Sequence, residues 1–336
     1  MSSTSGARMS VPHAREVVVT GIGLAVPGVA AYGDLLGPLP GEGGFDLVTG
    51  LRGREMRHKD RASRLALRAA ESALRDAALL DVEGAFTGAA DSTAVVVSTN
   101  LGNADSVCEA ADTITQEGVT GLSPLGLPQT SSNVVASWVA IRYGLRGPNL
   151  TVCNGITSGL DALAWARNLI SAHRATAVLV VGVEPANDVA AKLLGERSTD
   201  AAVAVVLEPS DTAADRGARP RAAIAGYARA RDLAEALATA GAAGEEPVDL
   251  WLGNEANTGT KLLGATHRID LEAQLGPLSG ALGVLQCAAA AAHLDTGATG
   301  RIVATAGGLH HDAAAALLLT TPPTTRPTTQ KPGEHL

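Results

Sequence analysis

The chain has 336 residues, of which 46% are hydrophobic, 18% charged and 2% aromatic. This length suits one large α/β domain or two smaller units, and the apolar share excludes a wholly disordered chain. The net charge of −8 and the scarcity of aromatic side chains argue against a nucleic-acid partner. Three widely spaced cysteines and no apolar run of about 18 residues predict a cytoplasmic protein with no metal site, cofactor or membrane span.

The first elements in chain order are a tail, a strand, a loop, a helix and a second strand. Residues Met1–Ala14 are polar and predicted to be disordered, whereas Glu16–Thr20 is an apolar, β-branched strand. The Gly/Pro-rich stretch Pro27–Gly53 is predicted to be a loop. Arg61–Leu80 is predicted to be an amphipathic helix, with small apolar residues on one face and arginines on the other. The strand Ala94–Ser98 follows it.

A second group of elements begins with Ser158–Ala172, which is apolar on nearly every side and is therefore predicted to be a buried helix. Strands at Ala177–Val181 and Ala202–Leu207 come next, and their apolar character suits a sheet that is covered on both faces. The acidic, Ala-rich stretch Pro209–Arg219 is predicted to be a connector.

The last elements repeat this arrangement. Strands are predicted at Val248–Leu252 and Arg301–Thr305, with a second all-apolar helix at Ser279–Leu294 between them. The Pro- and Thr-rich end Pro322–Leu336 is predicted to be disordered.

The chain also contains an internal repeat, which we call the internal echo. In each copy a strand and a turn are followed by the sequence Asp-Ala-Ala, which begins a second strand. Ala177–Asn187 leads to Asp200–Pro209 in this way, and Arg301–Gly308 leads to Asp312–Pro322. Each pair follows one of the two apolar helices. The echo predicts two duplicated halves, 15–209 and 219–321, that divide near Ser210–Gly217.

Several ordered motifs resemble those of the β-ketoacyl synthases. They are VVTGIG at 18–23, GLRGPN at 144–149, TVCNGITSGLDA at 151–162, LVVGVE at 179–184 and NTGT at 257–260. The resemblance extends from about Glu16 to Thr321. It implies an α/β, thiolase-like fold, with two pseudo-repeated βαβαβαββ halves stacked in five α-β-α-β-α layers around two central helices.

Active members of this family carry a Cys nucleophile, two His and a Lys, and the motifs place a different residue at each of these positions. A thiolate at a helix N-terminus attacks the acyl thioester, and the imidazoles help to expel CO2. Ile156 stands at the nucleophile position, Ala256 at the first His, Glu272 at the Lys and Pro277 at the second His. The resemblance therefore implies that the condensation chemistry is absent and that the chain has no catalytic residue.

Other residues have a structural as well as a functional interpretation. Cys153 lies three positions before Ile156 and is expected to be a buried structural thiol rather than a displaced nucleophile. Ser158 lies outside a G-x-S-x-G elbow and is expected to be a helix N-cap. His310 and His311 line either the vestigial pocket or, as we favour, an exposed turn. The arginines between residues 52 and 68 form either a docking patch for an acidic carrier protein or, again favoured, a solvated helix face.

The resemblance implies a non-catalytic subunit similar to the chain-length factor of a type II polyketide synthase. Such a subunit pairs with an active ketosynthase in a heterodimer, meets the acyl carrier protein through that complex and shapes the tunnel for the growing acyl chain. By the same resemblance, Asn149–Cys153 pairs across the dimer axis and Gly118–Trp138 reaches toward the partner's pocket. The expected interface and tunnel residues are Thr120, Leu125, Leu127, Gln129, Val134, Trp138, Leu150 and Val152.

Two other functions stay open. One is an acyltransferase or thioesterase-like enzyme of the same fold with a relocated site, and the other is a homodimeric binding protein or degenerate remnant. The chain also departs from aromatic-polyketide chain-length factors, which typically show Gln where Ile156 stands. It is shortened at Leu24–Leu51 and Ala186–Asp200. This compact form is more similar to partners in reducing systems that make polyenes or aryl polyenes.

Overall fold

The computed structural model describes residues 15–39, 58–197, 199–244, 246–254, 263–308 and 311–323. The strands are β1 Val17–Ala25, β2 Thr93–Ser98, β3 Asn149–Val152, β4 Ala177–Glu184, β5 Ala201–Pro209, β6 Ala222–Ala230, β7 Val248–Leu252, β8 His267–Ile269, β9 Arg301–Gly307 and β10 Ala314–Thr320. The longer helices are α2 Arg61–Asp76, α3 Ala104–Glu117, α4 Val134–Tyr143, α5 Ser158–Ser171 and α11 Leu282–Asp295.

Shorter helical segments connect these elements. The α-helical ones are α6 Asp188–Leu194, α7 Ser210–Asp215, α8 Leu233–Thr239 and α10 Leu271–Leu275. The 3-10 turns are η1 Tyr32–Leu36, η3 Ala90–Ser92, η4 Val119–Gly121, η5 Leu127–Thr130, η6 Gly155–Thr157 and η7 Ser279–Ala281. Among the described residues, none of the helices is long and apolar enough to cross a membrane.

The strands form one sheet in the order β3-β2-β4-β5-β1-β6-β10-β9-β7-β8. From one end to the centre the order is β3-β2-β4-β5-β1, and from the other end it is β8-β7-β9-β10-β6. The two orders are the same when β6 to β10 are matched with β1 to β5 along the chain. The two runs meet where β1 pairs with β6 through only two residue pairs, Val18 with Ala223 and Val19 with Ala222. The topology therefore carries the duplication that the internal echo predicts.

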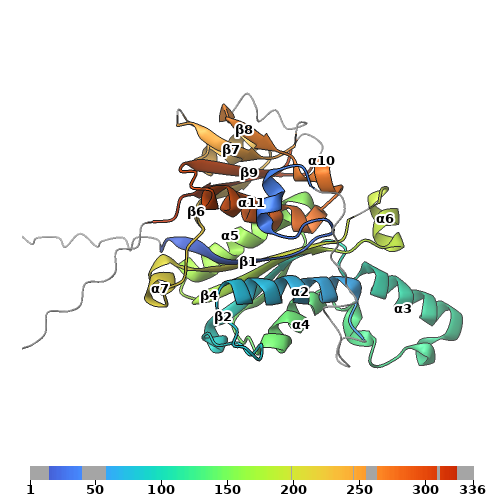
Figure 1. Ribbon diagram of the computed structural model, residues 1–336. Helices are drawn as coiled ribbons and strands as arrows, with labels where there is room; N and C mark the ends of the chain where they lie inside the picture. Colours follow the sequence, from blue (N-terminus) through green and yellow to red (C-terminus); the bar gives the residue numbers. More distant parts are fainter. Residues whose placement is uncertain are drawn as a thin grey trace, which may run out of the picture.

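Successive side chains along each strand point to opposite faces of the sheet, so each strand contributes to two layers of core. On β4, Val178 and Val180 face the central core, whereas Leu179 and Val181 face a second core beneath α2 and α4. On β9, Val303 faces a third core beneath α8. The layers are thus α2 with α4, a half-sheet, α5 with α11, the second half-sheet, and α8 (Figure 1). The expected five-layer thiolase-like fold is confirmed.

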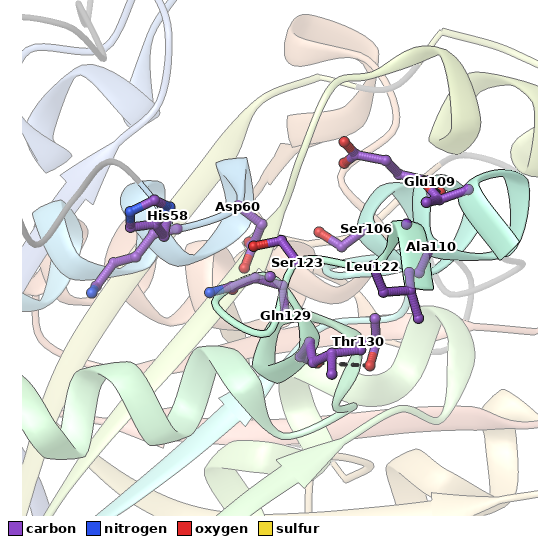
Figure 2. A pocket seen from close by; sticks show the side chains of 14 residues that line it. His58, Asp60, Ser106, Glu109, Ala110, Leu122, Ser123, Gln129 and Thr130 are labelled. Atoms are coloured by element: carbon purple, nitrogen blue, oxygen red, sulfur yellow. Dashed lines mark hydrogen bonds between the residues drawn. The ribbon is translucent and has the colours of Figure 1, made fainter. Parts of the chain in front are cut away.

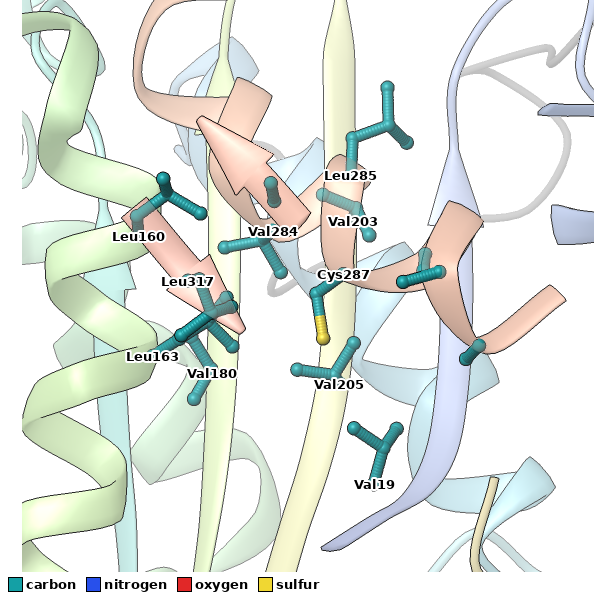
Figure 3. Close-up of a cluster of buried hydrophobic side chains, with 14 of the residues drawn as sticks. Val19, Leu160, Leu163, Val180, Val203, Val205, Val284, Leu285, Cys287 and Leu317 are labelled. Carbon is teal, nitrogen blue, oxygen red and sulfur yellow. The ribbon is translucent and has the colours of Figure 1, made fainter. Parts of the chain in front are cut away.

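The central layer explains why α5 and α11 are apolar on nearly every side. Twelve of the 14 residues of α11 are buried, five of them alanines, because half-sheets cover the helix on two sides. Cys287 lies in the middle of this layer, beside Val203 and Val205 of β5 (Figure 3). Complete burial raises the pKa of the Cys287 thiol to about 12.

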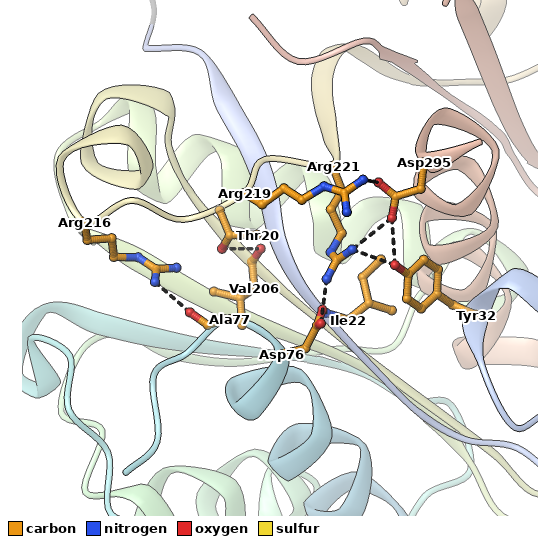
Figure 4. A network of polar contacts seen from close by, with 10 residues as sticks. All are labelled: Thr20, Ile22, Tyr32, Asp76, Ala77, Val206, Arg216, Arg219, Arg221 and Asp295. Carbon is orange, nitrogen blue, oxygen red and sulfur yellow. Dashed lines mark hydrogen bonds and ion pairs between the residues drawn. The ribbon is translucent and has the colours of Figure 1, made fainter. Parts of the chain in front are cut away.

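Polar contacts join the two runs of strands at one edge of this core (Figure 4). Arg221, at the start of β6, pairs with Asp76 at 2.5 Å and with Asp295 at 2.9 Å. It also donates to the hydroxyl of Tyr32 at 2.6 Å. One guanidinium therefore links the end of α2, the end of α11 and η1.

The strands and buried helices that the sequence predicts are all present, with three differences. The amphipathic helix ends at Asp76 rather than Leu80, because Ala78 adopts a left-handed φ of 55° and Leu79 N bonds back to Leu74 O. The predicted connector Pro209–Arg219 contains the helix α7. The pattern missed β6, whose Ala- and Arg-containing sequence is only half buried, and the three-residue β8.

Candidate functional site

The vestigial nucleophile and lysine positions lie on the same small cavity. Ile156, in η6, and Glu272, in α10, line it together with Leu282, Gln286 and Thr305. The volume of this cavity is about 10 Å³. Since roughly 10–15 Å³ is needed for one water molecule, the cavity has room for at most a single water.

Ile156 lines this cavity together with Leu282 and Gln286 of the central helix α11. It is partly buried and packs against the central core, immediately before α5 begins. The turn that carries it is possible because Gly155 takes a left-handed φ of 70°. An aliphatic side chain thus occupies the helix start, where a thiolate would gain from the helix dipole.

The side chain of Asn100 holds this turn in place. Its Nδ2 donates to Gly155 O and to Ser279 Oγ, both at 2.9 Å, and its Oδ1 accepts from Gly155 N at 3.1 Å. Asn100 Oδ1 also accepts from Ser158 Oγ at 3.0 Å. Sequence reasoning missed Asn100, although its place just beyond the carboxyl end of a buried strand was a usable signal.

A buried carboxylate supports the same turn from the other side. Asp161 Oδ2 accepts from Asn154 Nδ2 at 2.8 Å and from Thr157 Oγ1 at 3.0 Å, and Asp161 Oδ1 accepts from the hydroxyl of Tyr227. Arg229 lies 3.7 Å from the same carboxylate. Burial and the bond to Asp161 hold the pKa of the Tyr227 hydroxyl well above its ordinary value.

Glu272 has become a structural group. Its Oε1 accepts from Leu278 N at 3.0 Å, and burial raises the pKa of its carboxyl above the ordinary value. Pro277 lies in the same turn, and its carbonyl accepts from Thr199 N at 3.4 Å. Ala256 lies outside the described residues. The structure therefore brings Ile156, Glu272 and the Pro277 turn together, and it places no thiol or imidazole at these three positions.

Two buried amide oxygens have no hydrogen-bond partner on the cavity. Gln286 Nε2 donates to Leu252 O at 3.2 Å and to Thr305 O at 2.9 Å, which leaves Gln286 Oε1 unpartnered. Asn254 Oδ1 is also unpartnered, and both residues line the cavity. A single water that donates to one or both oxygens would satisfy them.

The two residues considered as alternative nucleophiles are placed differently from expectation. Cys153 is exposed, not buried, because it follows the edge strand β3 instead of continuing into the core. Partial desolvation and the nearby charge of Glu184 raise the pKa of its thiol, which opposes activation. Ser158 is not an N-cap: it is the first residue of α5, and its hydroxyl accepts from Asn154 N, four residues earlier, at 2.6 Å. His311 is exposed, and His310 lies outside the described residues.

The expected interface and tunnel residues fall into two groups. Thr120, Leu125 and Leu127 are exposed on the segment that follows α3. Gln129 and Val134 are buried, and Trp138 donates through Nε1 to Gln129 Oε1 at 3.4 Å. The rest of the set, Leu150 and Val152, lie on β3, which pairs with β2 and forms one end of the described sheet.

A larger cavity, about 400 Å³, lies beside that segment (Figure 2). Its lining comes from the stretch His58–Asp60, from α3, and from residues 121–130. Lys59 is 94% buried there, with Nζ 3.3 Å from the ring centroid of Trp138. Across the described ranges, no group of three or more His, Cys, Asp or Glu side chains is placed to hold a metal ion.

Comparison with known proteins identifies relatives of one kind. The family model for the N-terminal domain of β-ketoacyl synthases matches residues 30–197. A 3-oxoacyl-[acyl-carrier-protein] synthase 2 of Rhizobium meliloti is 27% identical over 57% of this chain and 51% of its own length. The granaticin polyketide putative β-ketoacyl synthase 1 of Streptomyces violaceoruber is 30% identical over 45% of this chain and 42% of its own length. The chain thus spans about half the length of the curated relatives it matches, or less.

Solved structures match over nearly the whole chain. One is a type II polyketide synthase acyl-carrier protein in complex with its ketosynthase, at 19% identity and a TM-score of 0.75 over 92% of this chain and 99% of the other. Another is the ishigamide ketosynthase/chain length factor, at 23% identity and a TM-score of 0.67 over 91% and 99%. These matches confirm the fold.

Proposed function

Because the chain belongs to the β-ketoacyl synthase family, we propose that it is a non-catalytic, chain-length-factor-like subunit of a type II polyketide synthase that pairs with an active ketosynthase. One observation carries the proposal. The cavity at the former active site measures about 10 Å³ and is lined by Ile156, so it holds neither a nucleophile nor an acyl group. The fold has been kept while the chemistry has been removed.

The described surface supports a role in pairing. The strand β3 ends the sheet with one edge that no described strand covers, and such an edge is available to a strand of another chain. Leu125 and Leu127 are 64% and 46% exposed on the neighbouring segment. Exposed leucines are typical of a surface that is buried in a complex.

The relatives favour the same assignment. One similar structure is titled a ketosynthase/chain length factor, and another contains a ketosynthase with its acyl-carrier protein and a hexaketide. Transferred to this chain, these titles suggest a ketosynthase as the direct partner, a carrier protein reached through the complex and a polyketide as the product.

Co-expression with an active type II ketosynthase tests the proposal. We expect a stable heterodimer, product formation by the pair, and no acyl transfer or thioester cleavage by this chain alone. Turnover by the isolated chain would instead support the relocated-site enzyme, and a stable homodimer that ignores the ketosynthase would support the binding-protein alternative.

A tunnel role has its own test. Leu125, Leu127 and Trp138 are replaced in turn by Ala and, for the leucines, by Phe, in the co-expressed pair. Since the space beside a growing chain limits its length, larger side chains should shorten the products and smaller ones should lengthen them. An unchanged product distribution across the whole series would contradict the tunnel role but leave the pairing role intact.

A further inference from the structure

The segment that we name the α3 lobe, residues 104–130, stands away from the layered body of the protein (Figure 1). None of the 14 residues of α3 is buried. A helix with no buried residue gains little from packing inside its own chain. Its side chains are therefore available to another molecule.

The charge of the α3 lobe is of one sign. Asp105, Glu109, Asp112 and Glu117 are all exposed, and no Lys, Arg or His occurs between Leu101 and Ile141. Within the described part of the chain, the ion pairs join other residues and leave these four carboxylates unpaired. Like charges gathered on one surface attract an oppositely charged partner and repel their own kind.

Apolar side chains share this surface with the carboxylates. Five of them are between 44% and 72% exposed, and they alternate along the lobe with the acidic positions. Exposed apolar groups beside one sign of charge indicate a protein-binding surface rather than a merely solvated helix. These residues are Val107, Ile114, Val119, Leu125 and Leu127.

The cavity of about 400 Å³ at the base of the lobe supplies a second, independent indication of an occupant (Figure 2). Gln129 lines it and is 5% exposed, and among the residues that the structure describes its Nε2 has no hydrogen-bond partner. The Oε1 atom of the same side chain already accepts from Trp138. A buried amide N–H without an acceptor is costly, so the site lacks a carbonyl or carboxylate oxygen.

We propose that the α3 lobe receives a segment of the partner subunit that carries Lys or Arg on an apolar surface. A main-chain carbonyl of that segment accepts from Gln129 Nε2, and its basic side chains pair with Glu109, Asp112 and Glu117. The inference rests on the proposed function, because it requires a partner chain. It adds the chemistry of that partner. It also gives a reason why the partner is not a second copy of this chain, because a two-fold contact through this lobe would place two acidic surfaces against each other.

A charge-neutral variant tests the electrostatic part. Glu109→Gln/Asp112→Asn/Glu117→Gln removes three carboxylates but keeps Asp105. The charge of Asp105, in the first turn of α3, interacts favourably with the helix dipole and stabilises the helix. At low salt, the rate of association with an active ketosynthase should fall about tenfold, and its dependence on salt should flatten. The matched control Glu83→Gln/Asp215→Asn/Glu235→Gln removes three exposed carboxylates elsewhere and should behave as the wild type.

Gln129→Leu tests the cavity part. It removes the unpartnered donor and should raise the dissociation rate about tenfold, with little effect on association. The control is Gln274→Leu, which replaces an exposed glutamine on α10 and should not do so.

The outcomes separate this inference from the proposed function. If the wild type binds the ketosynthase while the α3 variant and its control behave alike, the charge assignment is wrong and the pairing function stands. Formation of a homodimer through the lobe by the wild type would also overturn the inference. Absence of any ketosynthase binding by the wild type would overturn both.

Discussion

Gly159 of α5 and Gly283 of α11 face each other where the two central helices meet. A Cβ atom built on Gly159 would lie 2.6 Å from Gly283 N, and one built on Gly283 would lie 2.3 Å from Leu160 N. Each glycine is the second residue of its helix. The backbones of α5 and α11 are therefore in direct contact, at equivalent positions of the two helices.

The first prediction is that Gly283→Ala destabilises the fold. The added methyl group must push two buried backbones apart, and overpacking of this kind costs about 1–3 kcal/mol in the free energy of unfolding. Gly33→Ala is the control, because Gly33 has open space around its Cα. Urea denaturation compares the two variants, and equal stabilities would show that the helices separate without cost.

The second prediction concerns Arg221, whose side chain is 11% exposed between Asp76 and Asp295. Arg221→Leu leaves Asp76 without its cation and leaves Asp295 with only the more exposed Arg219, and it should lower the free energy of unfolding by about 3 kcal/mol. Arg146→Leu is the control, since Arg146 pairs with Asp91 on the open surface, where water and salt screen the pair and it contributes little. A loss at Arg221 as small as that at Arg146 would contradict the prediction.

The third prediction is a pH dependence caused by Glu272. Burial raises the pKa of this carboxyl above its ordinary value of 4.5, so the folded state binds the proton more tightly than the unfolded chain. This contribution to stability is present below pH 4.5 and is lost as the pH rises through the raised pKa.

Glu272→Gln should remove that loss. The amide oxygen still accepts from Leu278 N, so the variant should gain stability relative to the wild type as the pH rises from 4.5 toward neutrality. Unfolding measured across this range, beside the exposed substitution Glu235→Gln, checks it. A pH dependence parallel to that of the wild type would rule out the assigned role of Glu272.

The fourth prediction is an order of thiol reactivity. Cys108 and Cys153 are exposed and should react with a disulfide reagent in the native protein, whereas buried Cys287 should react only on unfolding. Because the pKa of Cys153 is raised, less thiolate forms there and its rate should be low at neutral pH. Single Cys→Ser variants assign the rates. A faster reaction at Cys153 than at Cys108 would revive the relocated-site enzyme.

Patterns that depend on burial predicted most of the fold. The central helices could be predicted because a helix that is covered by sheets on both sides has no polar face, as the alanines of α11 show. The strands of the central layers had continuous apolar runs for the same reason. The strand β6 was not predicted because its later residues are partly exposed. Among them, Arg229 contributes to a polar network instead of a core.

The site was predictable only in part. Motif positions identified Ile156 and Glu272, which the fold brings to one cavity. The polar residues that shape the turn, Asn100 and Tyr227, lie 56 positions before and 71 positions after Ile156. Their side chains meet only through the order of strands in the sheet. The end of a buried strand marked Asn100 as a candidate, but no local spacing reports which distant residues it contacts, and Tyr227 had no such signal.

The position of α11 also determines when the protein can mature on the ribosome. This helix lies against β4 and β5, yet it begins 98 residues after the end of β4 and 73 residues after the end of β5. Until it has emerged, α5 alone covers the inner face of the first half-sheet, and the part around Val203 and Val205 that α11 contacts stays open (Figure 3). Long-range closure of this kind delays folding and exposes apolar surface meanwhile. A fragment that stops before α11 should therefore aggregate or be held by chaperones, and the nascent chain should become protease-resistant in one late step.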